Sequence, residues 1–306
     1  MLKTLGLDSL ASISARDWLK DKKLDKRFLE AFVDGVSRVN YGQDSSINAF
    51  ADSVSLAGAG LVGSLYAVKE GNSRVMSGLL ASSGAKLRTQ SVAAVRRSAT
   101  SEGGYEVCTL DGQCEVFTSV VVAASLEFAN LTLETGLQPT TPRRPYQVTV
   151  ATFVLAEGLS AQYFGAASGG TVSADTVTTT SNSSIPFNSV AVHGTSGGRK
   201  VYKLFSQEVP PERLLNEMFV NVSNEMKQFV WHAYPILSPR PSADWPPFTL
   251  HPASSGDQFQ RGGVYYANAM ETPVSCMETE AIAAKNVALL VLRDLKRRGA
   301  AEAVFV

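Results

Sequence analysis

The sequence predicts a mixed α/β (α+β) protein, because segments with helical spacing and segments with strand-like alternation are interleaved along its 306 residues. Helical spacing marks residues 12–36 and 211–231. Alternating, β-branched runs mark residues 65–126, 147–155 and 200–207. Because 44% of the residues are hydrophobic, a chain of this length buries a large core, and we expect it to divide into two lobes.

Helices are predicted at the start of the chain. Two lie between residues 12 and 36, and the second, KRFLEAFVDGV, places Phe28, Phe32 and Val36 on one face. Helix or turn continues through residues 47–60, INAFADSVSLAGAG.

Strands and loops dominate the middle of the chain. Within residues 65–126 we expect two hairpin-linked strands and then a buried strand at Val120–Ala124. Residues 165–198 are rich in Gly, Ser and Thr, which predicts loops or edge strands. The stretch from Pro235 to Pro252 holds six of the 13 prolines and is expected to be irregular.

Two of the three cysteines, Cys108 and Cys114, bracket the turn sequence TLDGQ. A two-residue turn at Asp111 and Gly112 would pair Thr109 with Cys114 and put the two thiols on opposite faces of the hairpin. A longer loop would bring the thiols together as a disulfide, and both arrangements stay open. No C-x-x-C motif occurs and the three histidines have no companion at metal-ligand spacing, so no metal site is expected.

Composition argues against several classes of partner. Lys plus Arg and Asp plus Glu both number 28, so no net field favours nucleic acid or an anionic membrane. No apolar run approaches the roughly 18 residues of a membrane span, and the first residues lack the apolar core of a signal peptide. We therefore expect a globular protein without a transmembrane segment.

Residues 271–299, ETPVSCMETEAIAAKNVALLVLRDLKRRG, predict a helix whose first turn faces an anion. Ser275 and Glu278 match a capping box. The preceding run Gly263–Ala267 predicts a buried strand, so that strand, loop and helix N-terminus direct backbone N–H groups at one point. An ordinary turn without a ligand is the alternative. The rest of the helix carries an apolar face and then basic residues before a terminating glycine: Ile282, Val287, Leu290, Leu295, Arg293, Lys296, Arg297, Arg298 and Gly299.

Six short segments carry a family resemblance through their order and spacing over residues 25–295. They are RVNYGQ (38–43), INAFADSVSLAG (47–58), AVKEGNSRVMSGLL (67–80), KLFSQE (203–208), WHAYP (231–235) and YYANAMETPVSCMETEAIAAKNVALL (265–290). Together they resemble prenylcysteine oxidase, also called prenylcysteine lyase, a branch of the FAD-dependent, amine-oxidase-like enzymes. The resemblance implies a two-lobed oxidase whose flavin-binding and substrate lobes are interleaved along the chain.

The implied lobes divide the chain into four segments. Residues 1–62 and 127–260 would form the substrate lobe, and residues 63–126 and 261–306 the flavin-binding lobe. The family's first βαβ unit, with its G-x-G-x-x-G turn, has no counterpart in this sequence. We therefore expect the chain to correspond to the C-terminal portion of the fold, to lack the N-terminal dinucleotide-binding segment, and to be inactive alone.

The resemblance also implies FAD as the cofactor and names its contacts. The start of the last helix would face the flavin ring and the pyrophosphate, where its dipole would stabilise the negative charge of the reduced flavin. A second segment turns into a helix, and one residue lies where a backbone contacts adenine. The implied cofactor-binding residues are Gly71, Asn72, Val92, Asn268, Ala269, Met270, Ser275, Cys276 and Met277.

The implied reaction oxidises the thioether of farnesyl- or geranylgeranyl-cysteine with molecular oxygen and yields cysteine, a prenyl aldehyde and hydrogen peroxide. It needs no nucleophile and no metal from the protein. The prenyl tail requires a long apolar pocket, and Tyr41, Gln43, Asn48 and Phe50 are the candidates for its polar mouth and wall. Packing and capping around a helical hairpin is the alternative role of these four residues.

Family members commonly occupy the lysosome or other endomembrane compartments, so we expect a glycoprotein there. The N-x-[ST] sequons begin at Asn130, Asn182 and Asn221. A different class stays open, in which the chain is a flavin-free binding protein or partner subunit that uses an apolar pocket without redox chemistry.

Overall fold

The computed structural model describes residues 3–61, 66–101, 103–166, 170–181, 184–250 and 263–297. It divides into two compact units, each built from two separate stretches of chain. Unit 1 comprises Met1–Gly63 and Pro145–Ser242, and unit 2 comprises Ser64–Arg144 and Ala243–Val306. The predicted mixture of helix and strand is confirmed.

The borders of the units differ from the predicted borders after residues 126 and 260. The stretch that leads to Arg144 belongs to unit 2 because its strand β5, Thr132–Leu133, pairs in parallel with β1, Val92–Arg97. Residues 251–262 lie outside the described part of the chain.

Unit 1 begins with short helices whose ends are capped by side chains. Ser14, Asp25 and Asn48 each accept a hydrogen bond from a backbone N–H in the first turn of the helix that follows. These elements are η1 Lys3–Leu5, α1 Leu7–Leu10, α2 Ala15–Asp21, α3 Lys26–Phe28, η2 Leu29–Val33, α4 Asp34–Tyr41, α5 Ala49–Leu56 and η3 Ala57–Leu61, of which η2 and η3 are π-helical.

The predicted apolar face of the second helical segment is right for Phe32, which packs against the cluster of Leu19, Leu29 and Val33, but wrong for Phe28. Phe28 is 43% exposed, whereas Leu29 and Val33 are buried. The π-helical turn η2 explains the shift, because its wider turn changes which residues face the core from those expected with a uniform 3.6-residue period.

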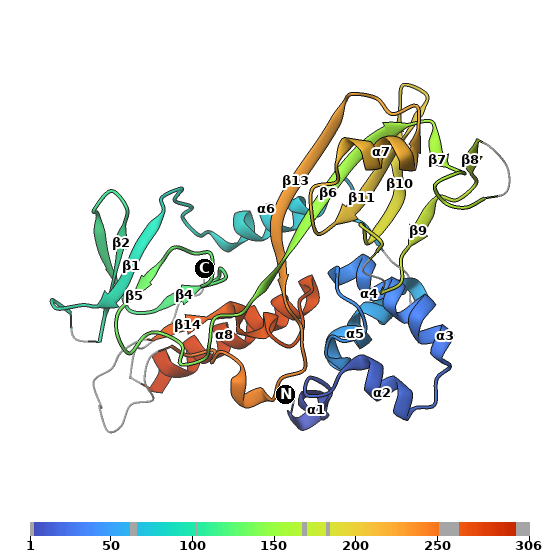
Figure 1. Cartoon of the computed structure of the whole chain (residues 1–306). Coiled ribbons are helices and arrows are strands. Elements are labelled where there is room, and N and C mark those ends of the chain that lie inside the picture. Colours follow the sequence, from blue (N-terminus) through green and yellow to red (C-terminus); the bar gives the residue numbers. More distant parts are fainter. Residues whose placement is uncertain are drawn as a thin grey trace. The chain divides into compact units, whose positions relative to one another are not determined.

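The second stretch of unit 1 forms a five-stranded sheet in the order β13-β6-β11-β10-β9 (Figure 1). Its antiparallel partners are β6 Tyr146–Ala156, β9 Thr176–Thr178, β10 Ser189–Ser196, β11 Arg199–Ser206 and β13 Met226–Pro235. A smaller sheet joins β12 Phe219–Val220, β7 Gly158–Ser160 and β8 Thr171–Val172. The predicted strands at 147–155 and 200–207 correspond to β6 and β11.

Two predictions for unit 1 are wrong. Strand β10 lies inside the sheet, between β9 and β11, although its Gly- and Ser-rich surroundings predicted loops or edges. Residues 226–231 belong to edge strand β13, whereas helix was predicted through residue 231. Met226 pairs with Val154 and Val230 with Val150, so pairing along β6 outweighs the local helical pattern.

The main core of unit 1 lies between the large sheet and helix α7, Glu212–Met218. Val154, Val190 and Leu204 of the sheet are fully buried, and Leu215 and Met218 of α7 pack in the same cluster. Each such side chain contributes about 1.5–3 kcal/mol when it leaves water. A second cluster joins Tyr41, Ile47, Ala51 and Leu237.

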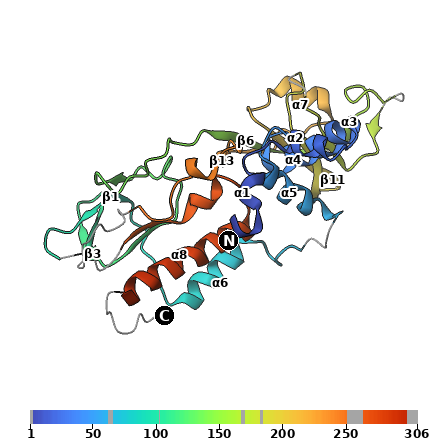
Figure 2. The same cartoon turned by 90° about the horizontal axis from the view of Figure 1, so that it is seen from below.

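Unit 2 holds a four-stranded sheet in the order β3-β2-β1-β5 and a parallel pair β14-β4. Beyond β1 and β5, its elements are α6 Ser73–Ser83, β2 Tyr105–Thr109, β3 Cys114–Phe117, β4 Val120–Val122, β14 Val264–Tyr266, η5 Ala267–Glu271 and α8 Met277–Arg297; η4 Ser242–Asp244 lies at the border of the units. Helices α6 and α8 are the cyan and red helices of Figure 2. The predicted strand at Val120–Ala124 ends at Val122, and Val121 is 45% exposed rather than buried.

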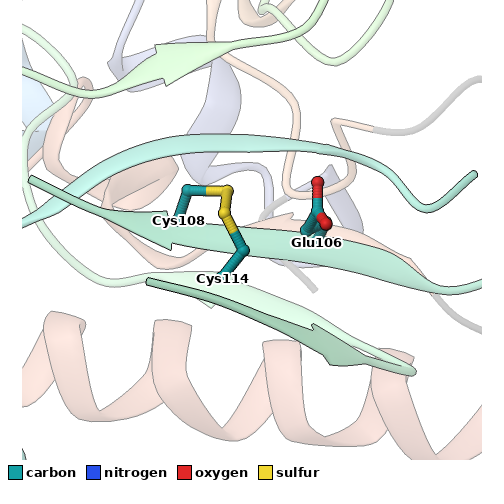
Figure 3. A group of neighbouring side chains, drawn as sticks. All are labelled: Glu106, Cys108 and Cys114. Atoms are coloured by element: carbon teal, nitrogen blue, oxygen red, sulfur yellow. A yellow bond between two sulfur atoms is a disulfide. The ribbon is translucent and has the colours of Figure 1, made fainter. Parts of the chain in front are cut away.

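Cys108 and Cys114 form a disulfide between β2 and β3 (Figure 3). The two residues face each other directly in the register, with a Cα–Cα distance of 4.1 Å. The two-residue turn that would have separated the thiols is therefore wrong, and the longer loop is right. The N–H of Thr109 donates to the carbonyl of Gln113, which closes that loop one residue earlier than the Asp111-Gly112 turn required.

Within the described part of the chain, no helix has both the length and the apolar composition that crossing a membrane requires. The longest, α8, spans Met277–Arg297 and carries acidic and basic side chains along its length.

Asp52 generates a pH-dependent prediction for the stability of unit 1. Burial raises the pKa of its carboxyl to about 6, although Ser37 donates a hydrogen bond to it. As pH rises from about 4 to 6, the unfolded chain therefore loses this proton before the folded chain does, and the folded state loses stability. We expect Asp52→Asn to remove this loss and to stabilise the chain by about 2 kcal/mol at neutral pH but not at pH 4.

Equilibrium unfolding in urea at both pH values measures the effect. Asp21→Asn, which removes the same charge from the exposed end of α2, is the matched control and should change little. An equal gain for Asp52→Asn at both pH values would contradict a raised pKa.

Candidate functional site

Helix α8 begins one residue later than the capping box predicted. Its first helical residue is Met277, and Cys276 precedes it. The Thr279 hydroxyl accepts a hydrogen bond from the Cys276 N–H at 3.1 Å and donates to the Cys276 carbonyl at 3.0 Å. The Ser275 and Glu278 box is therefore wrong, because Thr279 reaches back to cap the helix from its third position.

The first turn of α8 retains free backbone donors. The amides of Met277, Glu278 and Thr279 make no hydrogen bond to any residue that the structure describes, as expected at a helix N-terminus. Their partial positive charge suits an anionic ligand. Two carboxylates of the same turn, Glu278 and Glu280, oppose it, but burial and the nearby charge of Glu271 raise the pKa of Glu280 to about 7.

The buried face of α8 also differs from the predicted face. Ala283, Val287 and Asp294 are buried, and the Asp294 carboxylate accepts a hydrogen bond from the Tyr265 hydroxyl at 2.9 Å. Ile282 was predicted on this face but is 42% exposed. The prediction is right for Val287 and Leu290, which pack with Tyr265 and Ala267. Arg298 and Gly299, predicted to close the helix, lie outside the described residues.

The loop between β14 and α8 is held by one buried arginine, Arg144. Its side chain is 2% exposed and pairs with Glu127 at 2.9 Å and with Glu271 at 3.4 Å. It also donates to the Tyr266 hydroxyl at 2.7 Å and to the carbonyl of Asn268 at 3.2 Å. Burial alone would raise the pKa of Glu127, but the hydrogen bonds from Arg144 outweigh it and lower that pKa.

Arg144 binds one of the predicted cofactor-binding residues, Asn268, and two others follow it in the chain. Asn268 is held through its carbonyl and is partly exposed, whereas the Ala269 and Met270 side chains are buried in the protein. The two buried residues could meet a cofactor only through their backbone. Ser275 and Cys276 are partly exposed and Met277 is exposed.

The predicted cofactor segment at Gly71 and Asn72 lies beside the start of α8. Gly71 has a φ of 101°, which favours glycine, and Asn72 precedes α6. The Asn72 side chain accepts a hydrogen bond from the Val68 N–H and lies 3.9 Å from the Met277 sulfur. Two segments 205 residues apart therefore meet at the first turns of α6 and α8.

Val92, the predicted adenine contact, opens strand β1 and is 38% exposed. It lines an apolar hollow of about 250 Å³ together with Val107, Val121 and Leu131. Apolar walls of this kind suit a planar ring. Free amides, a neighbouring amide side chain and an apolar hollow make unit 2 chemically compatible with part of a dinucleotide cofactor.

The four predicted substrate residues lie together in unit 1, but their polar atoms are used within the protein. Gln43 donates to the Pro235 carbonyl and accepts from the Leu237 N–H, and Asn48 caps α5 and donates to the Leu237 carbonyl. Tyr41 and Phe50 are buried. Their contacts match the packing and capping alternative, and a role in binding substrate stays a prediction.

One group of side chains has the composition of a metal site, but it is not one. Glu106, Cys108 and Cys114 lie within 4.8 Å of one another (Figure 3). Both sulfurs are used in the disulfide, and Glu106 pairs with Arg96 at 2.5 Å. No other such group occurs among the residues that the structure describes.

A family model described as prenylcysteine lyase matches residues 1–302. The chain belongs to the prenylcysteine lyase family. Curated relatives include prenylcysteine oxidase 1 of Pongo abelii, which is 30% identical over 97% of this chain and 61% of its own length. Prenylcysteine oxidase 1 of Homo sapiens is 30% identical over 95% and 59%, and farnesylcysteine lyase of Arabidopsis thaliana is 30% identical over 95% and 55%.

The chain thus spans little more than half the length of these relatives. Among solved structures, a putrescine oxidase redesigned in its cofactor binding is similar with a TM-score of 0.57 and 12% identity, covering 93% of this chain and 69% of that one. The wild-type putrescine oxidase bound to putrescine gives a TM-score of 0.53. At these identities the similarity concerns the fold alone.

Sequence reasoning missed Arg144. It stands in the polar stretch PRRP beside Arg143, which is exposed, and no local pattern separates the two arginines. The only signal lay in the acidic residues Glu127 and Glu271, which are far from it in the sequence.

We expect Arg144→Met to destabilise unit 2 by about 3–5 kcal/mol, because it leaves Glu127 and Glu271 without their cation in a buried setting. Urea unfolding followed by circular dichroism measures the loss. Adding Glu127→Gln should recover part of it, since one unpaired charge is then removed. Arg143→Met is the matched control, and a loss as large as that of Arg144→Met would contradict the special role of Arg144.

Proposed function

We propose that this protein is an FAD-dependent thioether oxidase that cleaves prenylcysteine, in the degradation of prenylated proteins. The observation that carries the proposal is the match of residues 1–302 to the prenylcysteine lyase family. The names of the relatives, prenylcysteine oxidase and farnesylcysteine lyase, support the same substrate class. The fold shared with putrescine oxidase is compatible with an oxidase.

The proposed reaction balances without a group from the protein. Prenylcysteine, oxygen and water give cysteine, a prenyl aldehyde and hydrogen peroxide, as the carbon next to sulfur is oxidised and the carbon–sulfur bond is broken. FAD supplies the two-electron acceptor when bound, and oxygen is the final acceptor. The protein's own part is to position the thioether and to exclude water.

Unit 2 would hold the flavin and unit 1 the substrate. Asn72, Ser275, Cys276 and Met277 would contact the cofactor beside the free amides of α8, and Gly71, Asn268, Ala269 and Met270 would contribute backbone. Val92 would contact adenine from the apolar hollow. We propose that the glycine-rich βαβ segment for the pyrophosphate comes from sequence outside residues 1–306, since the relatives are longer.

We also propose that the protein works in an oxidising compartment, the lysosome or another part of the endomembrane system. The disulfide between Cys108 and Cys114 supports this, because such bonds are rare in the reducing cytosol. Asn130 is exposed and available for glycosylation there, whereas Asn182 lies outside the described residues.

The alternative function is a flavin-free binding protein. The visible absorbance of oxidised flavin in the purified protein distinguishes the two, provided that the protein is produced with a segment equivalent to the remaining length of its relatives.

We expect this extended protein, loaded with FAD, to release hydrogen peroxide from S-farnesylcysteine but not from S-methylcysteine. Both carry a thioether on the same amino acid, but only the farnesyl chain adds about 0.8 kcal/mol of binding for each buried CH₂. A coupled peroxidase assay over a range of substrate concentrations measures both rates. Equal rates would remove the prenyl assignment.

We expect Met277→Asp to lower the flavin content of the extended protein without lowering its stability. A carboxylate at the first position of α8 favours the helix dipole but repels an anionic cofactor. Flavin absorbance per protein and thermal unfolding measure the two effects. Leu289→Asp, which places the same charge on an exposed site of the same helix, is the control; equal flavin content in all three proteins would show that the first turn does not face the cofactor.

A further inference from the structure

Unit 1 contains a cavity of about 690 Å³ that none of the predicted site residues lines. It lies between α4, the segment that leads into β10, and residues 207–214, which comprise the connection from β11 and the first turn of α7. Its volume is in the range of pockets that bind small ligands. Cationic, anionic and amide side chains occur in its wall together with apolar ones.

The cation of this cavity is Arg38, on α4. Its Nε donates to the Thr179 hydroxyl at 2.9 Å and its Nη2 to the Phe187 carbonyl at 3.1 Å. Both acceptors are neutral, and no carboxylate lies within ion-pair distance of Arg38 among the described residues. Burial lowers the pKa of Arg38, but a guanidinium stays charged in proteins. The carboxylates of Asp44 and Asp34 lie beyond ion-pair distance but near enough to oppose this lowering of the pKa, so a half-buried, oriented cation without a direct ion pair faces the cavity.

Asn188 adds an unpaired amide to the same wall. The residue is 3% exposed, and its side chain makes no hydrogen bond to any residue in the described ranges. Its backbone is paired, since the N–H donates to the Phe205 carbonyl at 2.7 Å and the carbonyl accepts from the Thr179 hydroxyl at 2.7 Å. Because this amide lines the cavity, it is available to a polar ligand group beside Arg38.

An acid completes the polar part. Glu208 lines the cavity and is exposed, and its carboxylate pairs with no described residue. Beside it, Gln207 donates to the Gly42 carbonyl at 3.2 Å, which leaves its side-chain oxygen available. Apart from Ser181, whose hydroxyl donates to Asp44, the remaining wall is apolar and includes Ile185, Phe187, Val209 and Leu214.

We propose that this cavity binds the amino-acid end of an S-alkylated cysteine, with the α-carboxylate on Arg38 and Asn188 and the α-ammonium on Glu208. The apolar chain on sulfur lies against the wall formed by Ile185, Phe187, Val209 and Leu214. The assignment rests on the proposed function for its ligand class, and opposite charges in one cavity match a zwitterion better than a simple anion. The bond from Gln207 to Gly42 places the cavity next to the predicted residues Tyr41 and Gln43.

Ligand analogues and variants together test each contact. S-farnesylcysteine is compared with its methyl ester, which removes the carboxylate charge, and with its N-acetyl derivative, which removes the ammonium. Equilibrium dialysis measures the binding of each to the 306-residue chain and to the extended protein. We expect about a tenfold loss of affinity for the ester and for the N-acetyl derivative, since one charged contact is lost in each case.

The loss of affinity for each derivative should disappear in the variant that lacks the corresponding charged residue. In Arg38→Gln the ester and the free acid should bind equally, and in Glu208→Gln the N-acetyl derivative should bind as well as the parent. Asn188→Asp should weaken the free acid about tenfold and leave the ester less affected. Arg213→Gln and Glu212→Gln remove the same charges from exposed positions of α7 outside the cavity and should keep the wild-type pattern.

Arg38 also donates to Thr179 and Phe187, so a structural effect of its loss must be told apart from the loss of its charge. Thr179→Val removes one hydrogen bond of Arg38 but keeps the charge, and the ester should still bind about tenfold more weakly than the free acid. The assignment is overturned if the free acid and the methyl ester bind the wild type equally, or if their difference in affinity is unchanged in Arg38→Gln. So does failure of both proteins to bind S-farnesylcysteine. Peroxide release from the same ligand reports separately on the proposed function, which can hold while this cavity is wrong.

Discussion

The buried ion pairs of Arg144 are the constraint on which unit 2 depends. One guanidinium joins Glu127, Tyr266, Asn268 and Glu271, which come from stretches more than a hundred residues apart. Burying these charges costs several kcal/mol per ion, so the arrangement is stable only because each donor finds an acceptor. These contacts fix the position of η5, because Arg144 binds the Asn268 carbonyl within it and the Glu271 carboxylate at its end. Helix α8 begins six residues after η5 ends. The direction of the free amides at the start of α8 follows from that anchor.

The electrostatics of this helix start are set by a balance. Three free amides and the helix dipole attract negative charge, while Glu278 and Glu280 repel it. Because burial raises the pKa of Glu280 to about 7, its charge is largely absent in an acidic compartment and half present near neutrality. The first turn of α8 is therefore more attractive to an anion at acidic pH. Because Asn72 contacts Met277, the loop that precedes α6 lies beside this helix start and its pH-dependent charge.

The local sequence pattern predicted where helices and strands form better than it predicted their partners and their buried faces. The strands at 147–155 and 200–207 alternate strongly, and the helix after Cys276 has a clear period, so these were predictable from sequence. Residues 226–231 form a strand because β6 offers them a partner, and Phe28 faces solvent because a π-helical turn shifts the buried face. The hairpin register at Cys108 depended on one residue of loop length. Arg144, Arg38 and Asn188 acquire their roles only from neighbours distant in sequence, and no local signal marks them.

Both candidate sites are formed by residues that are distant in sequence. Short sequence segments can therefore indicate the family without showing which residues form a site. Gln43 binds Leu237 across 194 residues, and Arg144 binds Asn268 across 124. Each unit must therefore bring its second stretch of chain back onto the first before a site exists. The loop-closure entropy of that return is offset by apolar clusters that contain residues of both stretches. A substitution in either stretch can then act on a site that it does not touch. In unit 1, the cavity beside Arg38 is walled by α4 from the first stretch and by residues 185–188 and 207–214 from the second, so its shape reports on how the two stretches pack.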